Sequence, residues 1–438
     1  MPRRPCRAPR RLVALVALVA LVALLPLRGA AAQDPALVGP PTAARTNAPA
    51  PSPLRRLDGT TLSGDAADAV VRRLVAEHAI AGLQVAVVNG GRLAWSAAYG
   101  VRARGDGSGS APAGPDLPMQ RTTTTWAASI TKAVFATYVM RLVEQGRFDL
   151  DAPVARQLPR PLDAYAPYRE KAALLVRDTA WGRVTPRMLL THTSGLANFA
   201  WLEPDSLMRL HGAPGARYRY SGEGINLVQF LVEQRLGQPL DTLMRAALFA
   251  PLGMTRTSLT FRPEFAADIA DRFGPDGRFL ARTRRNPARA AGSMTSTAED
   301  LAAFAVALLD GRVLRAATRD AMLAPQVRIT ARTQFGPGSE TTGGEEAARL
   351  GLAYGVGWGL LTRTPHGPAF FKEGHGDGAQ TYLLCFARQR SCLVALANSD
   401  NGEFAFRPLV NALLGTDAVP WTWEGYTPAQ IRAAQEPR

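Results

Sequence analysis

The sequence predicts an α/β fold of the α+β type, in which one antiparallel sheet is formed from both termini and flanked by helices, with a mainly helical insertion. Short apolar runs bounded by turn residues occur at residues 83–99 and again at residues 354–397. Residues 150–310, between them, show mostly helical patterns with long loops. Strand segments near both ends of a chain can pair in one sheet, with the intervening helices packed beside it.

The first 32 residues have the pattern of a signal peptide. A basic segment rich in arginine precedes the apolar run Leu12–Leu25, and Ala30-Ala31-Ala32 precedes Gln33. The run is short for a membrane span. We therefore expect cleavage near Ala32, a periplasmic or secreted protein, and no integral membrane span after signal removal. The alternative is an uncleaved anchor.

Three further segments follow the signal peptide. Residues 33–58 are rich in proline and alanine without an apolar period, which is typical of a flexible tether. Residues 59–416 are expected to form the functional domain, with the helical insertion at about residues 150–310. Residues 417–438 are expected to be a C-terminal tail. At the start of the domain, Asn89-Gly90-Gly91 predicts the turn of a β-hairpin.

The charge of the chain does not indicate a nucleic-acid partner. Lysine and arginine total 51 against 36 acidic residues, which gives a net charge of +15. Residues 1–32 contain six arginines and no acidic residue, so the chain without them has a net charge of +9. The arginines of the rest of the chain are scattered rather than clustered with aromatic residues, so an arginine-rich solvated surface is the favoured interpretation. No His-Glu-x-x-His motif or Cys/His cluster is present, so neither a metal nor another cofactor is expected.

Lysine is rare in this chain, and its position is informative. Only Lys132, Lys171 and Lys372 are lysines. A buried lysine amine can lose its proton, whereas arginine in proteins does not. Lys132 lies three residues after Ser129 at the start of a predicted helix that ends near Gly146, so both side chains share one helix face. Ser129 is thus a candidate nucleophile with Lys132 as its base; the alternative is a helix-start serine beside a surface lysine.

Four later segments complete a pattern. They are residues 189–196, which contain His192, residues 214–222, which contain Tyr218 and Tyr220, residues 291–297, and Gly374-His375-Gly376-Asp377-Gly378. With Ser129-Ile130-Thr131-Lys132, and in this order, they resemble the serine β-lactamase and penicillin-binding-protein superfamily, most closely its class C branch. The resemblance covers about residues 60 to 415. It implies the sheet–helix fold described above.

The resemblance also implies roles for individual residues. Ser129 matches the acylated nucleophile, Lys132 the lysine that helps take its proton, and Tyr220 the tyrosine of the Tyr-x-Asn motif, a partner base. His375 stands where the third motif has Lys or His, and the backbone N–H of Gly378 matches one oxyanion donor, with that of Ser129 as the other.

Other positions depart from the pattern or have a second interpretation. Gly222 stands where Tyr-x-Asn has asparagine, and Asp377 where the third motif has glycine. Tyr218 is the alternative to Tyr220. His192 is interpreted as structural, within a turn that caps a helix. The pair Lys372-Glu373 is interpreted as an ion pair beside the site.

The implied chemistry agrees with elementary acid–base properties. A serine hydroxyl is a weak nucleophile and needs a base. Unperturbed lysine and tyrosine titrate near about 10.4 and 10, and burying them together lets one lose its proton near neutrality. We therefore expect an exported serine hydrolase that forms an acyl-enzyme with an ester, a D-amino-acid amide or peptide, or a β-lactam, its substrate being a small molecule or a cell-wall peptide. The alternative is a non-catalytic relative that binds cell-wall peptide or a protein partner.

Two cysteines remain after signal removal. Cys385 and Cys392 flank a predicted turn centred on Arg388-Gln389, so they face each other across two strands. A disulfide is expected in an oxidising compartment. The alternative is a pair of packed thiols.

Overall fold

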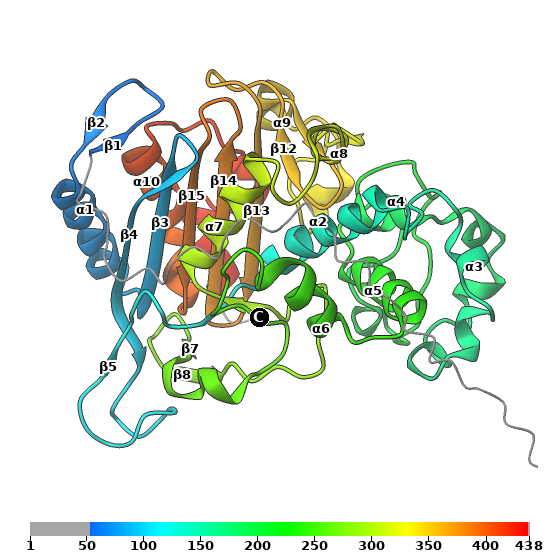
Figure 1. Cartoon of the computed structure of the whole chain (residues 1–438), viewed down its shortest axis with the longest axis horizontal. Coiled ribbons are helices and arrows are strands. Elements are labelled where there is room, and N and C mark those ends of the chain that lie inside the picture. Colours follow the sequence, from blue (N-terminus) through cyan, green and yellow to red (C-terminus); the bar gives the residue numbers. More distant parts are fainter. Residues whose placement is uncertain (1–52, 437–438) are drawn as a thin grey trace, which may run out of the picture. The chain divides into compact units, whose positions relative to one another are not determined.

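The structure is a computed structural model, and it describes residues 53–436. The predicted signal peptide (1–32) and most of the predicted tether (33–58) lie outside these residues. A nine-stranded antiparallel sheet has the order β10-β11-β12-β13-β14-β15-β3-β4-β5 (Figure 1). Its strands are β3 (Gly82–Asn89), β4 (Arg92–Ala103), β5 (Leu117–Pro118), β10 (Val327–Arg328), β11 (Leu352–Tyr354), β12 (Gly359–Leu361), β13 (Ala369–Gly376), β14 (Ala379–Phe386) and β15 (Ser391–Ala397). Because β15 pairs with β3, segments from both ends of the chain meet inside one sheet, and the predicted fold class is confirmed.

The sheet is buried on both faces because its strands alternate between two apolar clusters. Along β3, Leu83, Val85 and Val87 contribute to one cluster, and Ala86 and Val88 to the other. Helices α1 (Gly64–Glu77) and α10 (Glu403–Leu409) pack on the first face. Helices α2 (Ile130–Glu144) and α7 (Ala298–Leu309) pack on the second, where α8 (Ala316–Met322) contacts α2. Figure 1 shows α7 crossing the sheet.

The segment between α2 and α7 is mainly helical, as predicted. Its α-helices are α3 (Val154–Gln157), α4 (Pro186–Leu190), α5 (Gly222–Leu236) and α6 (Leu240–Met244), of which α3, α4 and α5 lie together beside the sheet in Figure 1. Single helical turns make up much of the rest: Leu162–Ala164, Ala166–Tyr168, Leu175–Arg177, Thr179–Arg183, Ala200–Leu202, Arg245–Phe249 and Pro263–Asp268. Helix α5 begins where the Ser221 side chain accepts from Gly224 N and ends at Gly237, whose φ of 65° is left-handed.

Three two-stranded sheets accompany the main one. They are β1 (Leu54–Arg55) with β2 (Thr61–Leu62), β6 (Thr125–Trp126) with β9 (Thr295–Ser296), and β7 (Asp271–Phe273) with β8 (Phe279–Arg282). The pair β6–β9 matters for the site, because β6 ends just before Ser129. It joins this segment to the one that leads into α7.

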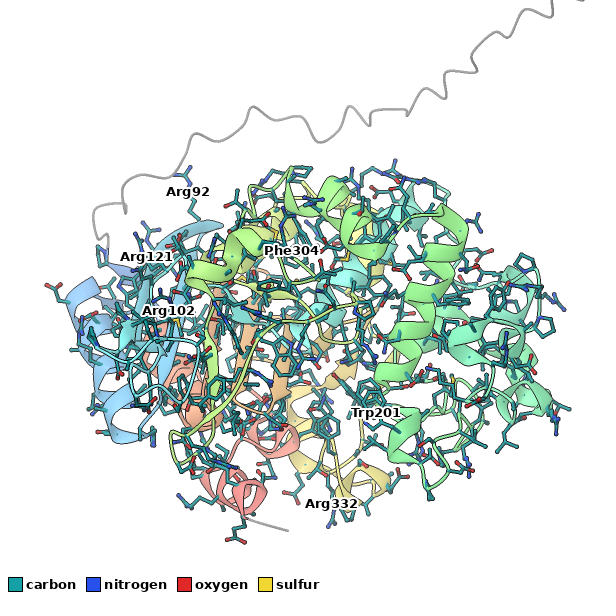
Figure 2. All side chains as sticks on the ribbon, turned by 90° about the horizontal axis from the view of Figure 1, so that it is seen from below. Arg92, Arg102, Arg121, Trp201, Phe304 and Arg332 are labelled. Carbon is teal, nitrogen blue, oxygen red and sulfur yellow. A yellow bond between two sulfur atoms is a disulfide. The ribbon has the colours of Figure 1, made fainter. Side chains whose placement is uncertain are left out.

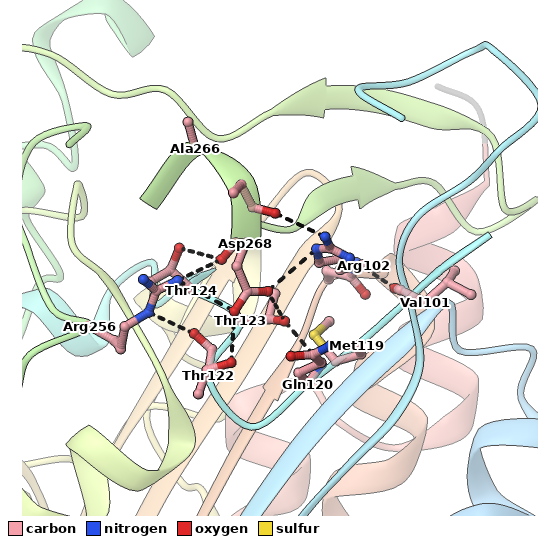
Figure 3. A network of polar contacts seen from close by, with 12 residues as sticks. Val101, Arg102, Met119, Gln120, Thr122, Thr123, Thr124, Arg256, Ala266 and Asp268 are labelled. Atoms are coloured by element: carbon pink, nitrogen blue, oxygen red, sulfur yellow. Dashed lines mark hydrogen bonds and ion pairs between the residues drawn. The ribbon is translucent and has the colours of Figure 1, made fainter. Parts of the chain in front are cut away.

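A polar network centred on Asp268 also holds in place the chain segment that leads into β6 and Ser129 (Figure 3). The Asp268 carboxylate accepts the hydroxyls of Thr122 (2.7 Å) and Thr123 (2.6 Å). It also pairs with Arg102 of β4 at 3.4 Å and with Arg256 at 3.5 Å. One carboxylate thus connects the main sheet, the insertion and the chain just before β6.

Residues 417–436, placed in a tail by the sequence analysis, form α11 (Trp421–Glu424) and α12 (Pro428–Gln435). Trp421, Trp423 and Ile431 are buried, so this segment packs as part of the folded unit. Nearby, α9 (Glu345–Leu350) precedes β11, and Trp423 N donates to Glu346 Oε2. Within residues 53–436, no helix combines the length and apolar character that crossing a bilayer requires.

Cys385 and Cys392 are directly opposite each other on β14 and β15, and the structure joins them in a disulfide with their Cα atoms 4.1 Å apart. Both are fully buried in the core. The predicted turn lies between them at residues 387–390.

Candidate active site

Ser129 is presented by a constrained turn between β6 and α2. Ala128, just before it, has a φ of +43°, a left-handed conformation that is uncommon for a residue with a side chain. This conformation is held by the surrounding chain, because Ala127 N donates to Met294 O and the Thr131 hydroxyl donates to Ala128 O. This turn places the Ser129 hydroxyl at the start of α2.

Lys132 contacts the Ser129 hydroxyl directly. Its Nζ lies 2.8 Å from Ser129 Oγ and 2.5 Å from Ala291 O, and only 2 % of the residue is exposed. Burial lowers the pKa of Lys132, and the positive charge of Lys372 lowers it further, while Tyr220 opposes both. An amine with a lowered pKa next to a hydroxyl is suited to act as a base.

Tyr220, rather than Tyr218, is the tyrosine beside this pair. Its ring centre lies 4.9 Å from Lys132 Nζ and 5.2 Å from Lys372 Nζ. Burial acts to raise the pKa of Tyr220, but the two ammonium groups outweigh it and the pKa is lowered. The Tyr218 hydroxyl instead accepts from Gln334, and burial raises its pKa well above the ordinary value. The geometry thus favours Tyr220 as the partner of Lys132.

Lys372 contacts the Tyr220 ring and so belongs to the site itself, whereas the sequence indicated only an ion pair beside the site. It is fully buried, and its Nζ donates to Glu373 Oε1 (2.6 Å) and Glu373 O (2.8 Å). Burial alone would lower the pKa of Lys372, but Glu373 and Tyr220 together raise it, so this ammonium stays charged. The sequence held a signal for this role, because Lys372-Glu373-Gly374 is itself a Lys-x-Gly pattern.

Strand β13 brings this Lys-x-Gly segment against Ser129. β12 pairs with β13 only at Ala369–Phe371, which leaves the later part of that edge open. A Cβ built on Gly374 would lie 2.9 Å from Ser129 N, so only glycine allows this approach. The Gly374 carbonyl accepts from the Thr381 hydroxyl of β14 (3.3 Å), so the backbone groups of the preceding residue, Glu373, face the open edge. Backbone groups two residues apart face the same edge, so the His375 N–H points there too.

Gly378 does not have the predicted role. It lies in the tight turn between β13 and β14, and its N–H donates to Asp400 Oδ1 at 2.6 Å. The prediction of Gly378 as an oxyanion donor is therefore corrected: the open-edge N–H near Ser129 is that of His375. The His375 imidazole does line the site, where its Nδ1 pairs with Glu403 Oε1 at 2.8 Å. Burial tends to lower its pKa, but Glu403 outweighs this and raises it.

Gly222 has no room for the asparagine of the Tyr-x-Asn motif. A Cβ there would lie 2.4 Å from the Phe199 ring, and the Gly222 N–H donates to Asn198 Oδ1 at 2.9 Å. Two amides that were not predicted from the sequence, Asn198 and Asn226, line the cavity that contains Ser129. Asn226 lies four residues after Gly222 on α5, a spacing that was a usable signal.

His192 is packed in the protein interior, in agreement with the structural role that the sequence indicated. It is fully buried, and its Nδ1 accepts from Ser221 N at 3.2 Å. Its ring packs against those of Tyr218, Tyr220 and Tyr354. It thereby supports the segment that carries Tyr220.

Ser129, Lys132 and Tyr220 line one open cavity of about 870 Å³. Its aromatic lining is Trp126, Phe199, Trp201, Phe335, Trp423 and Tyr426. Trp201, labelled in Figure 2, is 56 % exposed and stacks on Phe199 with ring centres 3.9 Å apart. The cavity therefore places Ser129 and its partner Lys132 beside an apolar, aromatic wall.

The chain matches the family "Beta-lactamase" over residues 67–416. It belongs to this family, which confirms the superfamily that the sequence motifs indicated. Esterase EstB of Burkholderia gladioli is 32% identical over 232 residues, which cover 45% of this chain and 53% of EstB. The chain thus spans about half the length of that relative.

Two further proteins are similar over more of the chain. Penicillin-binding protein 4 of Amycolatopsis lactamdurans is 28% identical over 309 residues, 66% of this chain and 76% of that protein. The crystal structure of D-alanine carboxypeptidase AmpC from Burkholderia cenocepacia superposes with a TM-score of 0.60 at 20% identity, covering 80% of this chain and 98% of that one. At this identity the superposition shows a shared fold.

Proposed function

We propose that this protein is an exported serine hydrolase that forms an acyl-enzyme on Ser129 and acts on carboxylic esters or D-amino-acid amides in preference to β-lactams. The observation that carries the proposal is the 2.8 Å contact between Ser129 Oγ and the buried Lys132 Nζ, inside an open cavity that Tyr220 also lines. Similarity to an esterase and to a penicillin-binding protein supports the same class of reaction.

The site residues divide the reaction among them. Lys372 remains charged and stabilises the phenolate form of Tyr220, so that Lys132 and Tyr220 together accept the Ser129 proton. The Ser129 oxygen attacks the substrate carbonyl, and the N–H groups of Ser129 and His375 donate to the resulting oxyanion. The same proton passes to the leaving group, and water then releases the acyl group from Ser129 with Tyr220 as base.

The preference against β-lactams rests on Glu373 and Gly222. A β-lactam carries a carboxylate, but Lys372 is already paired with Glu373, and Glu373 itself lines the cavity and repels another anion there. Residue 222 offers no side-chain amide to the substrate. A neutral ester needs neither contact, and the aromatic wall suits its apolar parts.

Export belongs to the proposal because residues 1–32 have the pattern of a signal peptide. A buried disulfide between Cys385 and Cys392 is consistent with an oxidising compartment such as the periplasm or the medium. The substrate is then a small molecule or a cell-wall peptide outside the cytoplasm.

A three-substrate panel tests the proposal. The substrates are 4-nitrophenyl butyrate, a chromogenic cephalosporin and a D-alanyl-D-alanine peptide, with Ser129→Ala as control. We expect kcat/KM for the ester to exceed that for the cephalosporin by about tenfold to a hundredfold, the effect of one missing charge-assisted hydrogen bond. The peptide also carries a carboxylate, so its turnover relative to the cephalosporin shows whether an amide bond is accepted at all. Fastest turnover of the cephalosporin contradicts the specificity. Absence of turnover and of acylation with all three favours the non-catalytic alternative, binding of cell-wall peptide or a protein partner.

A further inference from the structure

Two arginines face the cavity without an acidic partner. Arg285 and Arg289 line the cavity that contains Ser129, and both also line an adjoining hollow of about 290 Å³ with Arg272, Arg282 and Arg284. Within residues 53–436, neither guanidinium has a carboxylate oxygen within 4.0 Å. Burial and the charges of Arg272 and Arg289 lower the pKa of Arg285 to about 10, partly opposed by Asp377. The arginines therefore create a positive potential that the protein leaves largely uncompensated.

Each carboxylate that lines the cavity has a hydrogen-bond partner other than Arg285 or Arg289. Glu373 pairs with Lys372, Glu403 with His375, and both oxygens of Glu424 accept the Tyr382 hydroxyl. These three are the acidic residues among the lining side chains. An anion that binds Arg285 and Arg289 must therefore come from outside the described chain.

Arg285 is held in place rather than free to move. Its guanidinium carbon lies 3.6 Å from the centre of the Trp126 ring, a stacked position. Trp126 is itself fixed, because its Nε1 donates to Gly292 O. A turn in which the Ser293 hydroxyl accepts from Arg289 N anchors the backbone of the second arginine. Ordered guanidinium groups lose less freedom when they bind a ligand.

Strand β13 shows where these arginines lie relative to the nucleophile. Lys372 is next to Tyr220, and Gly374 is against Ser129. Gly376 is against the Trp126 ring, which a Cβ there would approach to 2.3 Å. Arg285 and Lys372 thus lie on opposite sides of Ser129 along the strand. Two residues of strand correspond to about 7 Å, so an anion at Arg285 is roughly that far from the reacting carbonyl.

We propose that Arg285 and Arg289 form a subsite for a carboxylate on the acyl part of the substrate, so that the enzyme prefers half-esters of dicarboxylic acids. The inference rests on the proposed serine-hydrolase function and names the substrate class of that same site. Guanidinium groups bind carboxylates through paired hydrogen bonds, which fixes the acyl chain as well as attracting it. The anion binds on the side of Ser129 away from Glu373, which would repel it.

Matched esters test the subsite. Mono-4-nitrophenyl adipate and 4-nitrophenyl hexanoate have acyl chains of equal length and differ in the terminal carboxylate. For the wild-type protein at low ionic strength we expect kcat/KM to favour the adipate about tenfold to a hundredfold. The ratio should fall in Arg285→Gln/Arg289→Gln and as salt is added. Arg284→Gln is the matched control, since Arg284 lines the adjoining hollow only.

A binding measurement separates this inference from the proposed function. Calorimetry of monomethyl adipate with Ser129→Ala needs no turnover, and we expect Kd to rise about tenfold or more when Arg285→Gln/Arg289→Gln is added. A preference for hexanoate or no preference, or a ratio and Kd unchanged in the double variant, overturns the subsite. If neither ester is hydrolysed by the wild type but monomethyl adipate still binds through the arginines, the hydrolase function fails and the anion site stands.

Discussion

At the scale of single residues, two buried lysines have pKa values shifted in opposite directions. Lys132 contacts Ser129 and a carbonyl oxygen, and burial lowers its pKa. Lys372 is equally buried, but the Glu373 carboxylate raises its pKa against the effect of burial. The opposite pKa shifts of these two amines therefore come from their different partners. Between them, the pKa of Tyr220 is lowered by both ammonium groups.

Lys372→Gln should slow ester hydrolysis by about tenfold to a hundredfold, since it removes a charged contact from the site. The pKa of Tyr220, now lowered by Lys132 and Lys372, should rise when Lys372 is lost. The rising limb of the pH–rate profile should therefore move to higher pH. Steady-state rates between pH 5 and 10 check this, with Tyr218→Phe as the matched control.

A second variant separates catalysis from folding. Lys372→Gln leaves Glu373 buried without its cation, which destabilises the fold. Lys372→Gln/Glu373→Gln removes that charge, so it should regain stability. Glu373 itself raises the pKa of Tyr220, though by less than Lys372 lowers it, so the double variant should keep only part of the shift in the pH profile. A wild-type profile in Lys372→Gln itself would show that Lys372 has only a structural role.

Part of the site could be predicted from the sequence because its spacing is local. Ser129 and Lys132 lie one helical turn apart, and Tyr220 lies just before α5. The residues that form the third motif on β13 could not be identified in the same way. Lys372-Glu373-Gly374 and His375-Gly376-Asp377 follow each other on one strand, and counting along the sequence does not choose between them. The choice depends on where β12 ends and where α2 meets the open edge of β13, which are tertiary features.

At the scale of elements, α7 carries a buried acid near its start. The Asp300 carboxylate accepts the Thr257 hydroxyl (2.8 Å) and Arg256 N (2.9 Å). Burial nonetheless raises its pKa to about 6, despite these hydrogen bonds. The folded protein therefore favours the protonated form of Asp300. The stability that this preference contributes is fully present below the ordinary pKa of 3.8 and is lost as the pH rises through about 6.

Asp300→Asn should therefore raise Tm above pH 7 and have a smaller effect near pH 4. An amide keeps the size and an acceptor oxygen without the buried charge. Thermal unfolding at pH 4, 6 and 8 checks the trend, with Asp276→Asn as an exposed control that should change little at any pH. A variant less stable than the wild type at pH 8 would contradict the assigned cause.

The elements that the sequence predicted well are those with a sustained period. Strands β3, β14 and β15 at the centre of the sheet are apolar runs of seven or eight residues, and α2 and α7 are regular helices with turn residues or caps at their ends. Residues 417–436 have no such period, because α11 and α12 are short and held by single aromatic anchors such as Trp421 and Trp423. Their packing depends on side-chain contacts that sequence spacing does not show.

At the scale of the whole molecule, the Cys385–Cys392 disulfide joins two strands inside the main sheet. The loop it closes is short, so it constrains the unfolded chain little, and reduction should cost at most about 2–3 kcal/mol of unfolding free energy. Protein prepared without residues 1–32, which contain Cys6, should show no free thiol when it is denatured without reductant. Two thiols per chain would contradict the disulfide.

The central claim is that Ser129 becomes acylated within a site completed by Lys132 and Tyr220. Intact-mass spectrometry after treatment with a serine-reactive fluorophosphonate tests it most directly. We expect a single adduct, located at Ser129 by peptide mapping and absent in Ser129→Ala. It should form about 10²–10⁴-fold more slowly in Lys132→Arg, which keeps the charge but loses the removable proton. An adduct that persists in Ser129→Ala, or labelling of Lys132→Arg at the wild-type rate, would contradict it.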